Sequence, residues 1–336
     1  MKWLALDIGG ANLKAADGEQ FAFSQPFPLW QKHEQLTEAL RALIAQVSRV
    51  DHLAATMTGE LADCFTTKNE GVHYILTALQ NAAGGRHTRV YMTSGLLVSV
   101  LVARRQPLLV ASSNWHALAR FAGKFTGKRP GLLIDIGSTT TDIIPLIDGM
   151  PVTIGHTDVM RMANGELVYT GVERSPVCAM AAWIPWRGKK VPPAQELFAT
   201  MWDVYLTLGD LPEEPQSTHT ADHRPATKIA ARDRLARAIC ADREMFSEED
   251  AIVAADAVAG AQVKKLAAQA AIVLGRMPQP PEVVVVCGQG EFLAKRLINA
   301  LDIQPEIISL GEKLGPVLSR CAAAHALAVL AQEGNR

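Results

Sequence analysis

The sequence of 336 residues has no excess of one charge and no long charged run. Its 33 Lys and Arg nearly balance its 34 Asp and Glu, which leaves a net charge of -1. A basic patch with interleaved aromatic residues is also missing, so nucleic acid is not an expected partner. The longest basic feature, Lys124 with Lys128 and Arg129, is typical of a solvated turn.

The sequence has few cysteines and no CxxC pair. Their odd total of five predicts neither a disulfide framework nor a zinc site, and it favours a reducing cytoplasm. The apolar run at residues 283–287 is far too short to cross a bilayer, and Met1 leads straight into an apolar strand. We therefore expect neither export nor membrane anchoring. The cysteines are Cys64, Cys178, Cys240, Cys287 and Cys321.

Hydrophobic residues make up 49% of the chain, enough for a large core and two domains. Strand-like runs alternate with helical stretches, which favours an α/β fold. Leu36, Leu40 and Leu43 stand at helical spacing and predict an amphipathic helix over 35–50. We expect further helices at 249–275 and 314–332, and strands at 52–57, 89–93, 108–111, 132–136, 143–147 and 283–287.

The pattern also predicts how the chain is divided. We expect a first half at 1–130 and a second half at 131–336. The segment from about 156 to 250 is rich in Trp, Pro and charge, and its strand periodicity is weaker. It is typical of an inserted lid or substrate region that is helical in its second half.

Two segments of the chain share nearly the same sequence pattern. Residues 4–14 read LALDIGGANLK and residues 132–142 read LLIDIGSTTTD, so that Asp7 and Asp135 lie 128 positions apart (135 minus 7). Each is an apolar strand that stops at an acid and turns through glycine into a hairpin, where backbone N–H groups and hydroxyls can approach an anion. Two such turns facing one another across a cleft could hold a phosphate or diphosphate, with the aspartates on Mg²⁺.

This interpretation assigns candidate residues to each turn. Asp7 and Asp135 are candidate metal ligands and catalytic groups, and Asp142 joins them or accepts a substrate proton. Lys14 is a candidate phosphate contact, or else a solvated lysine at a strand edge. The other candidate phosphate-binding residues are Gly9, Gly10, Asn12, Gly137, Ser138, Thr139 and Thr140.

Further candidates come from the loops that follow other predicted strands. The triplet after the strand at 52–57 should line the same cleft, although Thr-Gly-Glu would equally begin a helix. Asn114 and Trp115 stand where the strand predicted around 108–111 ends, and Trp115 is equally typical of a core. Arg161 lies in the Gly-rich start of the insert. The candidate substrate contacts are therefore Thr58, Gly59, Glu60, Asn114 and Arg161.

Other polar residues have a plain structural alternative. Glu166, Tyr169 and Arg174 could contact a substrate from the insert. His116 and His156 have no partner at metal-ligand spacing. Cys287, inside a strand, is typical of a small buried hydrophobe. Helix caps or surface ion pairs are the alternative for Asp222, Arg224 and Arg232.

The two turns, followed late by VVVVCGQGEFLAK at 283–295, resemble the actin, sugar-kinase and heat-shock ATPase superfamily. The resemblance implies two ribonuclease H-like halves around a cleft. The late segment stands where that superfamily binds adenosine, but it has Gly288-Gln289-Gly290 in place of two adjacent glycines. This departure argues against ATP, which stays open as a ligand, and makes Gly288 and Gln289 candidate substrate contacts.

Six further blocks narrow the resemblance, and together they span nearly the whole chain. They are DIGGANLKAAD, TMTGELADCF, ASSNWHALARF, DIGSTTTDIIP, TDVMRMANGELVYTGVERSPVC and TADHRPATKIAARDRLARAIC. On these blocks the chain is identified as a member of the hydantoinase/oxoprolinase-related proteins linked to tetrahydromethanopterin one-carbon transfer. In archaea, similar proteins form the ether core of methanofuran. That resemblance implies joining the phenol of a tyramine or tyrosine unit to an aminomethylfuranylmethyl diphosphate, with release of diphosphate.

Two other classes of function remain open at this stage. The fold also serves ATP-dependent small-molecule kinases and hydantoinase-like amide hydrolases. A non-catalytic assembly protein is the third class, although Asp7, Asp135 and Asp142 at the turns argue against it. The expected partners are the small-molecule diphosphate and phenol substrates, with a homodimer as a possible assembly.

Overall fold

The computed structural model describes residues 2–334, and its first sheet is built from the N-terminal part of the chain. The strand order is β3-β2-β1-β4-β5-β6, with β1 antiparallel to β2 and parallel to β4. Their bounds are β1 (Trp3–Ile8), β2 (Asn12–Ala16), β3 (Ala22–Pro26), β4 (His52–Met57), β5 (His87–Tyr91) and β6 (Leu97–Ser99).

The second sheet repeats this connectivity. Its order is β10-β8-β7-β13-β14, with β9 paired to β8, and β7 is antiparallel to β8 and parallel to β13. The repeat of a hairpin followed by a parallel strand confirms the predicted α/β fold. The bounds are β7 (Gly131–Ile136), β8 (Thr141–Ile147), β9 (Met150–Pro151), β10 (Leu167–Val168), β13 (Val283–Cys287) and β14 (Glu306–Ser309).

Helices cover both sheets and build the region between β10 and β13. On the first sheet, α2 and α3 bury leucines and valines against β1 and β4; on the second, α11 and α12 do the same. The helices are α1 (Leu29–Lys32), the 3-10 helix η1 (His33–Gln35), α2 (Leu36–Ala45), α3 (Lys68–Ala83), α4 (Val100–Arg105), α5 (Pro107–Val110), α6 (Asn114–Thr126), α7 (Asp158–Ala163), α8 (Val177–Met180), α9 (Met201–Leu208), α10 (Lys228–Arg237), α11 (Glu248–Leu274), α12 (Glu291–Ala300), α13 (Leu310–Arg320) and α14 (Ala322–Glu333).

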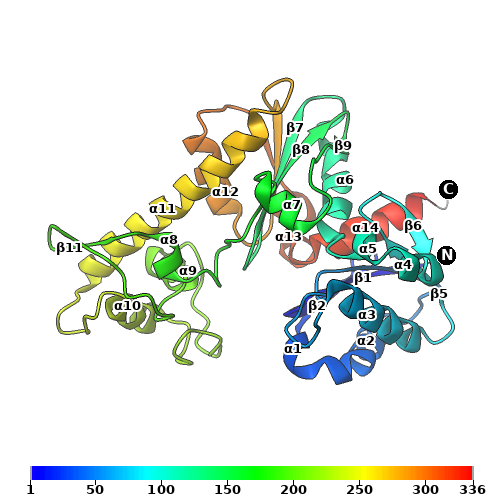
Figure 1. The fold of residues 1–336 in the computed structure, drawn as a ribbon, viewed down its shortest axis with the longest axis horizontal. Helices are drawn as coiled ribbons and strands as arrows, with labels where there is room; N and C mark the ends of the chain where they lie inside the picture. Colours follow the sequence, from blue (N-terminus) through cyan, green and yellow to red (C-terminus); the bar gives the residue numbers. More distant parts are fainter. Residues whose placement is uncertain (1, 335–336) are drawn as a thin grey trace.

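Each sheet is packed against one helix from the other half of the chain. The helix α6, which precedes β7, packs on the second sheet, whereas the last helix, α14, packs on β1 and β4 of the first. The two helices also pack against one another, near the centre of Figure 1. Trp3, Tyr91 and Leu327 share one apolar cluster there, which joins the two sheets into one body.

The insert projects away from both sheets, at the left of Figure 1. It contains α8 to α10 and the hairpin of β11 (Ile184–Trp186) and β12 (Lys189–Val191), and α11 leads back from it to the second sheet. Its core holds an ion network: Arg234 is fully buried and binds Asp203 at 2.7 Å and Asp222 at 3.0 Å. A buried guanidinium is tolerated because several hydrogen bonds compensate its desolvation.

Ion pairing also accounts for the three later polar residues of the insert. Asp222 binds Arg234 and Arg237, Arg224 lies 3.6 Å from Asp233, and Arg232 lies 3.8 Å from Glu248. The structural alternative for Asp222, Arg224 and Arg232 is thereby confirmed.

Most predicted elements agree with the structure, and two do not. The strands at 52–57 and 283–287 are found residue for residue. The predicted strand at 108–111 is wrong, because Pro107 stands at the first position of the short helix α5, where its fixed φ favours a helical turn. The predicted helix at 314–332 is two helices, α13 and α14, which meet at an angle of 98°.

The helix α11 is long and apolar enough to cross a membrane, as is the bent pair α13 and α14 taken together. Core helices have the same composition. One side of α11 contributes Ala254, Val258 and Leu266 to the core of the second sheet.

Two helical glycines provide a matched test of this packing. A Cβ on Gly123 of α6 would come within 2.0 Å of the carbonyl oxygen of Gly149, whereas a Cβ on Gly260 of α11 would meet nothing within 4 Å. Gly123→Ala should lower the free energy of unfolding by about 1–3 kcal/mol through overpacking. Gly260→Ala should raise it by about 1 kcal/mol through helix propensity. Urea unfolding measures both, and equal stabilities of the two variants would contradict the packing of α6.

Candidate functional site

The two predicted hairpins place their acids at equivalent positions in the two sheets. In the first hairpin Asp7 stands opposite Lys14, and in the second Asp135 stands opposite Asp142. On the other side, the parallel strands β4 and β13 place Thr56 beside Asp7 and Cys287 beside Asp135. Because β1 and β7 are buried apolar strands, each acid is carried into the interior at a strand end.

The turns themselves are equivalent as well. The N–H of Gly9 donates to the carbonyl of Asn12 at 3.0 Å, and the N–H of Gly137 donates to that of Thr140 at 2.9 Å. A Cβ on Gly9 would lie 2.8 Å from the carbonyl oxygen of Asn12, so this turn requires glycine there.

The next glycine of the first turn and the glycine of the second have no such requirement. A Cβ on Gly10 or Gly137 would make only ordinary contacts, at 4.0 and 3.8 Å, and neither residue has the left-handed backbone that favours glycine. The missing side chains leave the backbone open to close approach by a ligand.

Asp7, Lys14 and Asp135 form one electrostatic cluster, called here the carboxylate–lysine cluster. Burial raises the pKa of Asp7, and it raises that of Asp135 to about 7, with the Asp142 carboxylate adding to the effect. The Lys14 ammonium lowers the pKa of both acids, and the Asp7 carboxylate acts on Asp135. The structure therefore brings the two repeated aspartates together.

This cluster suits a hard cation that arrives with its own oxygen ligands. Asp7 is only 6% exposed, and its Oδ1 is buried without a hydrogen-bond partner among residues 2–334. Within those residues, no group of three or more His, Cys, Asp or Glu is arranged to hold a metal ion alone. Mg²⁺ is commonly bound by one or two carboxylates together with substrate phosphates and water, which is the set that Asp7 and Asp135 could complete.

The charge of Asp142 is matched by Arg161. The two side chains meet at 2.5 Å, and Arg161 also donates to the carbonyl of Glu166 at 3.1 Å. The guanidinium is 1% exposed and stacks 4.1 Å from the ring centroid of the buried Trp115. Arg161 is thus buried and holds Asp142 in place, and its predicted contact with substrate stays a prediction. Trp115 is confirmed as a core residue.

Two further loops lie beside the turns at equivalent places. The N–H groups of Thr58 and Gly59 donate to the carbonyl of Ile8, and that of Gly290 donates to Ile136. A Cβ on Gly59 would lie 3.2 Å from the carbonyl carbon of Gly9. A Cβ on Gly288, whose φ is 89°, would lie 2.7 Å from an Asp135 carboxylate oxygen. Three predicted contacts thus adjoin the turns: Thr58, Gly59 and Gly288.

Glu60 belongs to a different cluster, which links the two halves. Its carboxylate accepts from the Ser112 hydroxyl at 2.8 Å and lies 3.9 Å from Lys68. Ser112 is also 2.7 Å from Asp158 of α7, which pairs with Lys68 at 2.6 Å. One hydroxyl proton cannot serve both carboxylates, so the geometry fits a protonated Glu60. The residue is 1% exposed, and burial raises its pKa to about 7. These contacts give Glu60 a structural role, and its predicted contact with substrate stays a prediction.

Asn114 is also placed differently from the prediction. It begins α6 instead of ending a strand, and its side-chain oxygen accepts from the N–H of Trp115 at 2.7 Å. The predicted strand end was wrong because the preceding apolar run is helical.

The other polar residues that were open to either interpretation differ in their burial and contacts. Glu166 is fully buried and accepts from the N–H groups of Ile154 and Gly155, which is a structural role. Tyr169 is 63% exposed. His116 bonds to the Tyr91 hydroxyl at 2.9 Å, and burial lowers its pKa to about 4.

Sequence reasoning named Arg174 but did not predict that its loop, 170–175, closes on the second turn. The N–H groups of Val172 and Glu173 donate to the carbonyls of Gly137 and Ser138, each at 3.0 Å. The Glu173 carboxylate bonds to Gln289, and burial raises its pKa. No periodicity marks this loop, because its order comes from hydrogen bonds to distant backbone.

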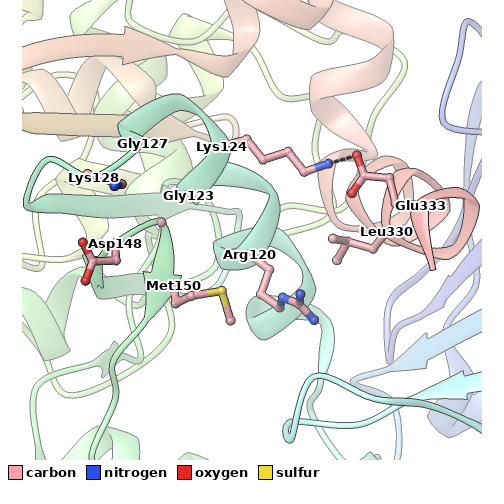
Figure 2. Close-up of a pocket in the computed structure, with 10 residues that line it drawn as sticks. Arg120, Gly123, Lys124, Gly127, Lys128, Asp148, Met150, Leu330 and Glu333 are labelled. Carbon is pink, nitrogen blue, oxygen red and sulfur yellow. Dashed lines mark hydrogen bonds and ion pairs between the residues drawn. The ribbon is translucent and has the colours of Figure 1, made fainter. Parts of the chain in front are cut away.

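A separate pocket of about 310 Å³ lies at the C-terminal end of α6, away from the turns. Figure 2 shows Lys124 reaching Glu333 across it, with Arg120 and Lys128 on the same helix and its following turn. It contains none of the predicted site residues.

The repeated sheets and crossing helices form the fold that actin, sugar kinases and heat-shock ATPases share. A proposed N-acetylmannosamine kinase from Listeria monocytogenes has the same fold, with 14% identity, a TM-score of 0.50 and complete coverage of both chains. Within this fold class, the chain belongs to the hydantoinase/oxoprolinase family, whose model matches residues 51–333.

Two curated relatives carry one name, (4-{4-[2-(gamma-L-glutamylamino)ethyl]phenoxymethyl}furan-2-yl)methanamine synthase. The protein from Methanocaldococcus jannaschii is 34% identical over 98% of this chain and 97% of its own length. The one from Methanococcus vannielii is 29% identical over 59% of this chain and 89% of its own length. Both are named as synthases, and this protein is accordingly an enzyme.

The burial of Glu60 predicts an unusual dependence of stability on pH. Its pKa is raised above the usual 4.5 to about 7, so the folded protein holds this proton more tightly than the unfolded chain does. Stability from this group is complete below pH 4.5 and is lost as the pH rises to about 7. Glu60→Gln should therefore raise the free energy of unfolding at pH 8, by up to about 3 kcal/mol. Denaturant unfolding at pH 4.5 and 8 measures the difference, which should nearly vanish at the lower pH. A destabilised variant at pH 8 would contradict the neutral form of Glu60.

Proposed function

We propose that the protein is a synthase of methanofuran-type cofactor biosynthesis. It joins the phenol oxygen of a tyramine or tyrosine derivative to the methylene of an aminomethylfuranylmethyl diphosphate and releases diphosphate. This is an alkyl transfer that forms an ether, in one-carbon metabolism linked to tetrahydromethanopterin. The relative from Methanocaldococcus jannaschii, matched over nearly both full lengths, supports the assignment. The carboxylate–lysine cluster between two glycine turns is the structural observation that carries it.

The chemistry needs a site that stabilises a leaving diphosphate. As the bond to the furanylmethyl carbon breaks, negative charge grows on the leaving oxygens, and preorganised donors stabilise it most in the transition state. Lys14 supplies a cation beside both aspartates, and the open backbone at Gly10 and Gly137 lets N–H groups approach the oxygens. The hydroxyls of Ser138, Thr139 and Thr140 add donors on the second turn.

Asp7 and Asp135 would hold a Mg²⁺ ion between the protein and the diphosphate. Such an ion neutralises the charge that develops on the leaving group. The pair Asp142–Arg161 keeps a further fixed carboxylate beside Asp135, which raises the proton affinity of Asp135 until a cation arrives. Mg²⁺, a cytoplasmic location and a homodimer stay predictions.

A nucleotide-dependent reaction is the competing assignment. The loop at Gly288 to Glu291 replaces the adjacent glycines of adenosine sites, and the side chain of Gln289 in it is bonded to Glu173. An adenine would have to displace this contact, whereas a diphosphate ester needs no adenine site.

The first test removes one carboxylate of the cluster at a time. Asp7→Asn and Asp135→Asn should each lower kcat for ether formation by roughly 10²-fold or more. Each variant loses a carboxylate that would hold the cation beside the leaving diphosphate. The exposed Asp256→Asn on α11 is the control and should leave kcat unchanged. Mass spectrometry of the ether product, with Mg²⁺ and then with a chelator, measures the rates. Full activity of both variants in chelator would refute the metal role.

The second test compares ligands by thermal protection with Mg²⁺ present. Diphosphate at 100 times its dissociation constant should stabilise the folded protein by roughly 2.7 kcal/mol, whereas ATP should give no shift. The Asp135→Asn variant should lose the diphosphate shift. Tight ATP binding, with ADP release that depends on a small-molecule acceptor, would instead assign the protein to the kinase or amide-hydrolase class.

A further inference from the structure

Glu173 is held on the second turn by its backbone, independently of its side chain. Its N–H donates to the carbonyl of Ser138 at 3.0 Å, and its own carbonyl accepts from the N–H of Trp202 at 3.1 Å. The N–H of Arg174 donates to the same Ser138 carbonyl. These bonds hold the start of the insert directly against the second turn, which binds the diphosphate in the proposed reaction.

The carboxylate of Glu173 lies where three parts of the chain meet. It is half-buried and bonds to the amide of Gln289 on the loop after β13. The charged groups that face it are Glu214 of the insert, Arg320 at the end of α13 and the adjacent Arg174, all of them exposed. Burial raises the pKa of this carboxyl most, and the Glu214 carboxylate raises it further. Its hydrogen-bond partner is thus a neutral amide.

The other acids near the second turn are already engaged. Asp142 is bound by Arg161 at 2.5 Å. Glu166 accepts from two backbone N–H groups and from Arg276 at 3.2 Å. Asp135 lies in the carboxylate–lysine cluster, where the proposed reaction needs it on the cation side of the diphosphate. Glu173 has no arginine or lysine hydrogen bond in the part of the chain that the structure describes, and the bond from Gln289 leaves acceptor sites on its carboxylate for a substrate hydroxyl.

We infer that Glu173 is the catalytic base that takes the phenol proton in the proposed ether-forming reaction. The bond from the phenol oxygen to the furanylmethyl carbon forms, and the bond from that carbon to the diphosphate oxygen breaks. The electron pair of the broken bond leaves with diphosphate. The phenol proton passes to the Glu173 carboxylate and then to water, so no oxidant, reductant or further reactant is needed.

The chemistry favours a carboxylate with this environment. A phenol has a pKa of ~10, so an ordinary carboxylate is a weak base for it. A carboxylate of raised proton affinity is a better acceptor, and it can act in concert with loss of the leaving group. This assignment replaces Asp142. Burial raises the pKa of Asp142 as well, but its carboxylate is held by Arg161 at 2.5 Å and is therefore less free to meet a substrate hydroxyl.

The test uses Glu173→Gln with tyramines of increasing ring fluorination, whose phenols are more acidic. With tyramine itself, kcat should fall by roughly 10²–10³-fold, the usual effect of losing a general base. The defect should shrink as the phenol becomes more acidic, and KM for the diphosphate substrate should stay the same. A defect of equal size across all the phenols would overturn the assignment, as would full activity of Glu173→Gln.

Glu214→Gln is the matched control on the neighbouring carboxylate. Removing that like charge should move the acid limb of the pH–rate profile of kcat to lower pH and leave its plateau unchanged, whereas Glu173→Gln should abolish the limb. An unmoved limb in Glu214→Gln would contradict the titration of Glu173. If Glu173→Gln does not fold, Glu173→Asp with the same phenol series replaces it. Absence of any ether product from the wild type would refute the proposed function itself, which separates that failure from a failure of this inference.

Discussion

Two carboxylates near the ends of apolar strands are the constraint on which the rest of the site depends. Asp7 is buried in β1 and Asp135 is half-buried in β7, so water solvates their charge poorly. Burying a charge is unfavourable unless a partner compensates it. Lys14 lowers the pKa of both acids, but burial still raises each above its usual value. In the proposed reaction, a cation that binds together with the diphosphate would complete this compensation.

Much of this could be read from the sequence, because the signals were local. An apolar run that ends in Asp and Gly specifies a strand and a hairpin through the conformation of its own residues, so both turns and the strands at 52–57 and 283–287 were predictable. The strand predicted at 108–111 failed for an equally local reason, the proline at its start. Partners of long polar side chains were not predictable, since Arg161 meets Asp142 and Glu60 meets Ser112 only through tertiary packing.

The packing of α6 and α14 explains how the two halves are held close enough for their charged side chains to interact. Because α6 packs on the second sheet and α14 on the first, neither sheet is covered by its own part of the chain alone. The apolar cluster around Tyr91 and Leu327 fixes the two sheets at one side. A second contact between the halves is polar. There, Lys68 of α3 pairs with Asp158 of α7 beside the buried Glu60. The contacts of this polar cluster depend on protonation as well as on packing, because burial raises the pKa of Glu60 to about 7.

The loop at 170–175 joins the repeated and the unrepeated parts of the molecule. Gln262 of α11 bonds to the Thr170 hydroxyl and to the Gly171 carbonyl, while Val172 bonds to the second turn. A Cβ on Gly171 would lie 2.3 Å from the carbonyl oxygen of Gly137, so loop and turn cannot separate without breaking close contacts. In the proposed reaction, the repeated turns would bind the diphosphate, which is common to phosphate esters. The insert has no counterpart in the first half, so in that proposal it is the part of the chain that would distinguish one acceptor from another.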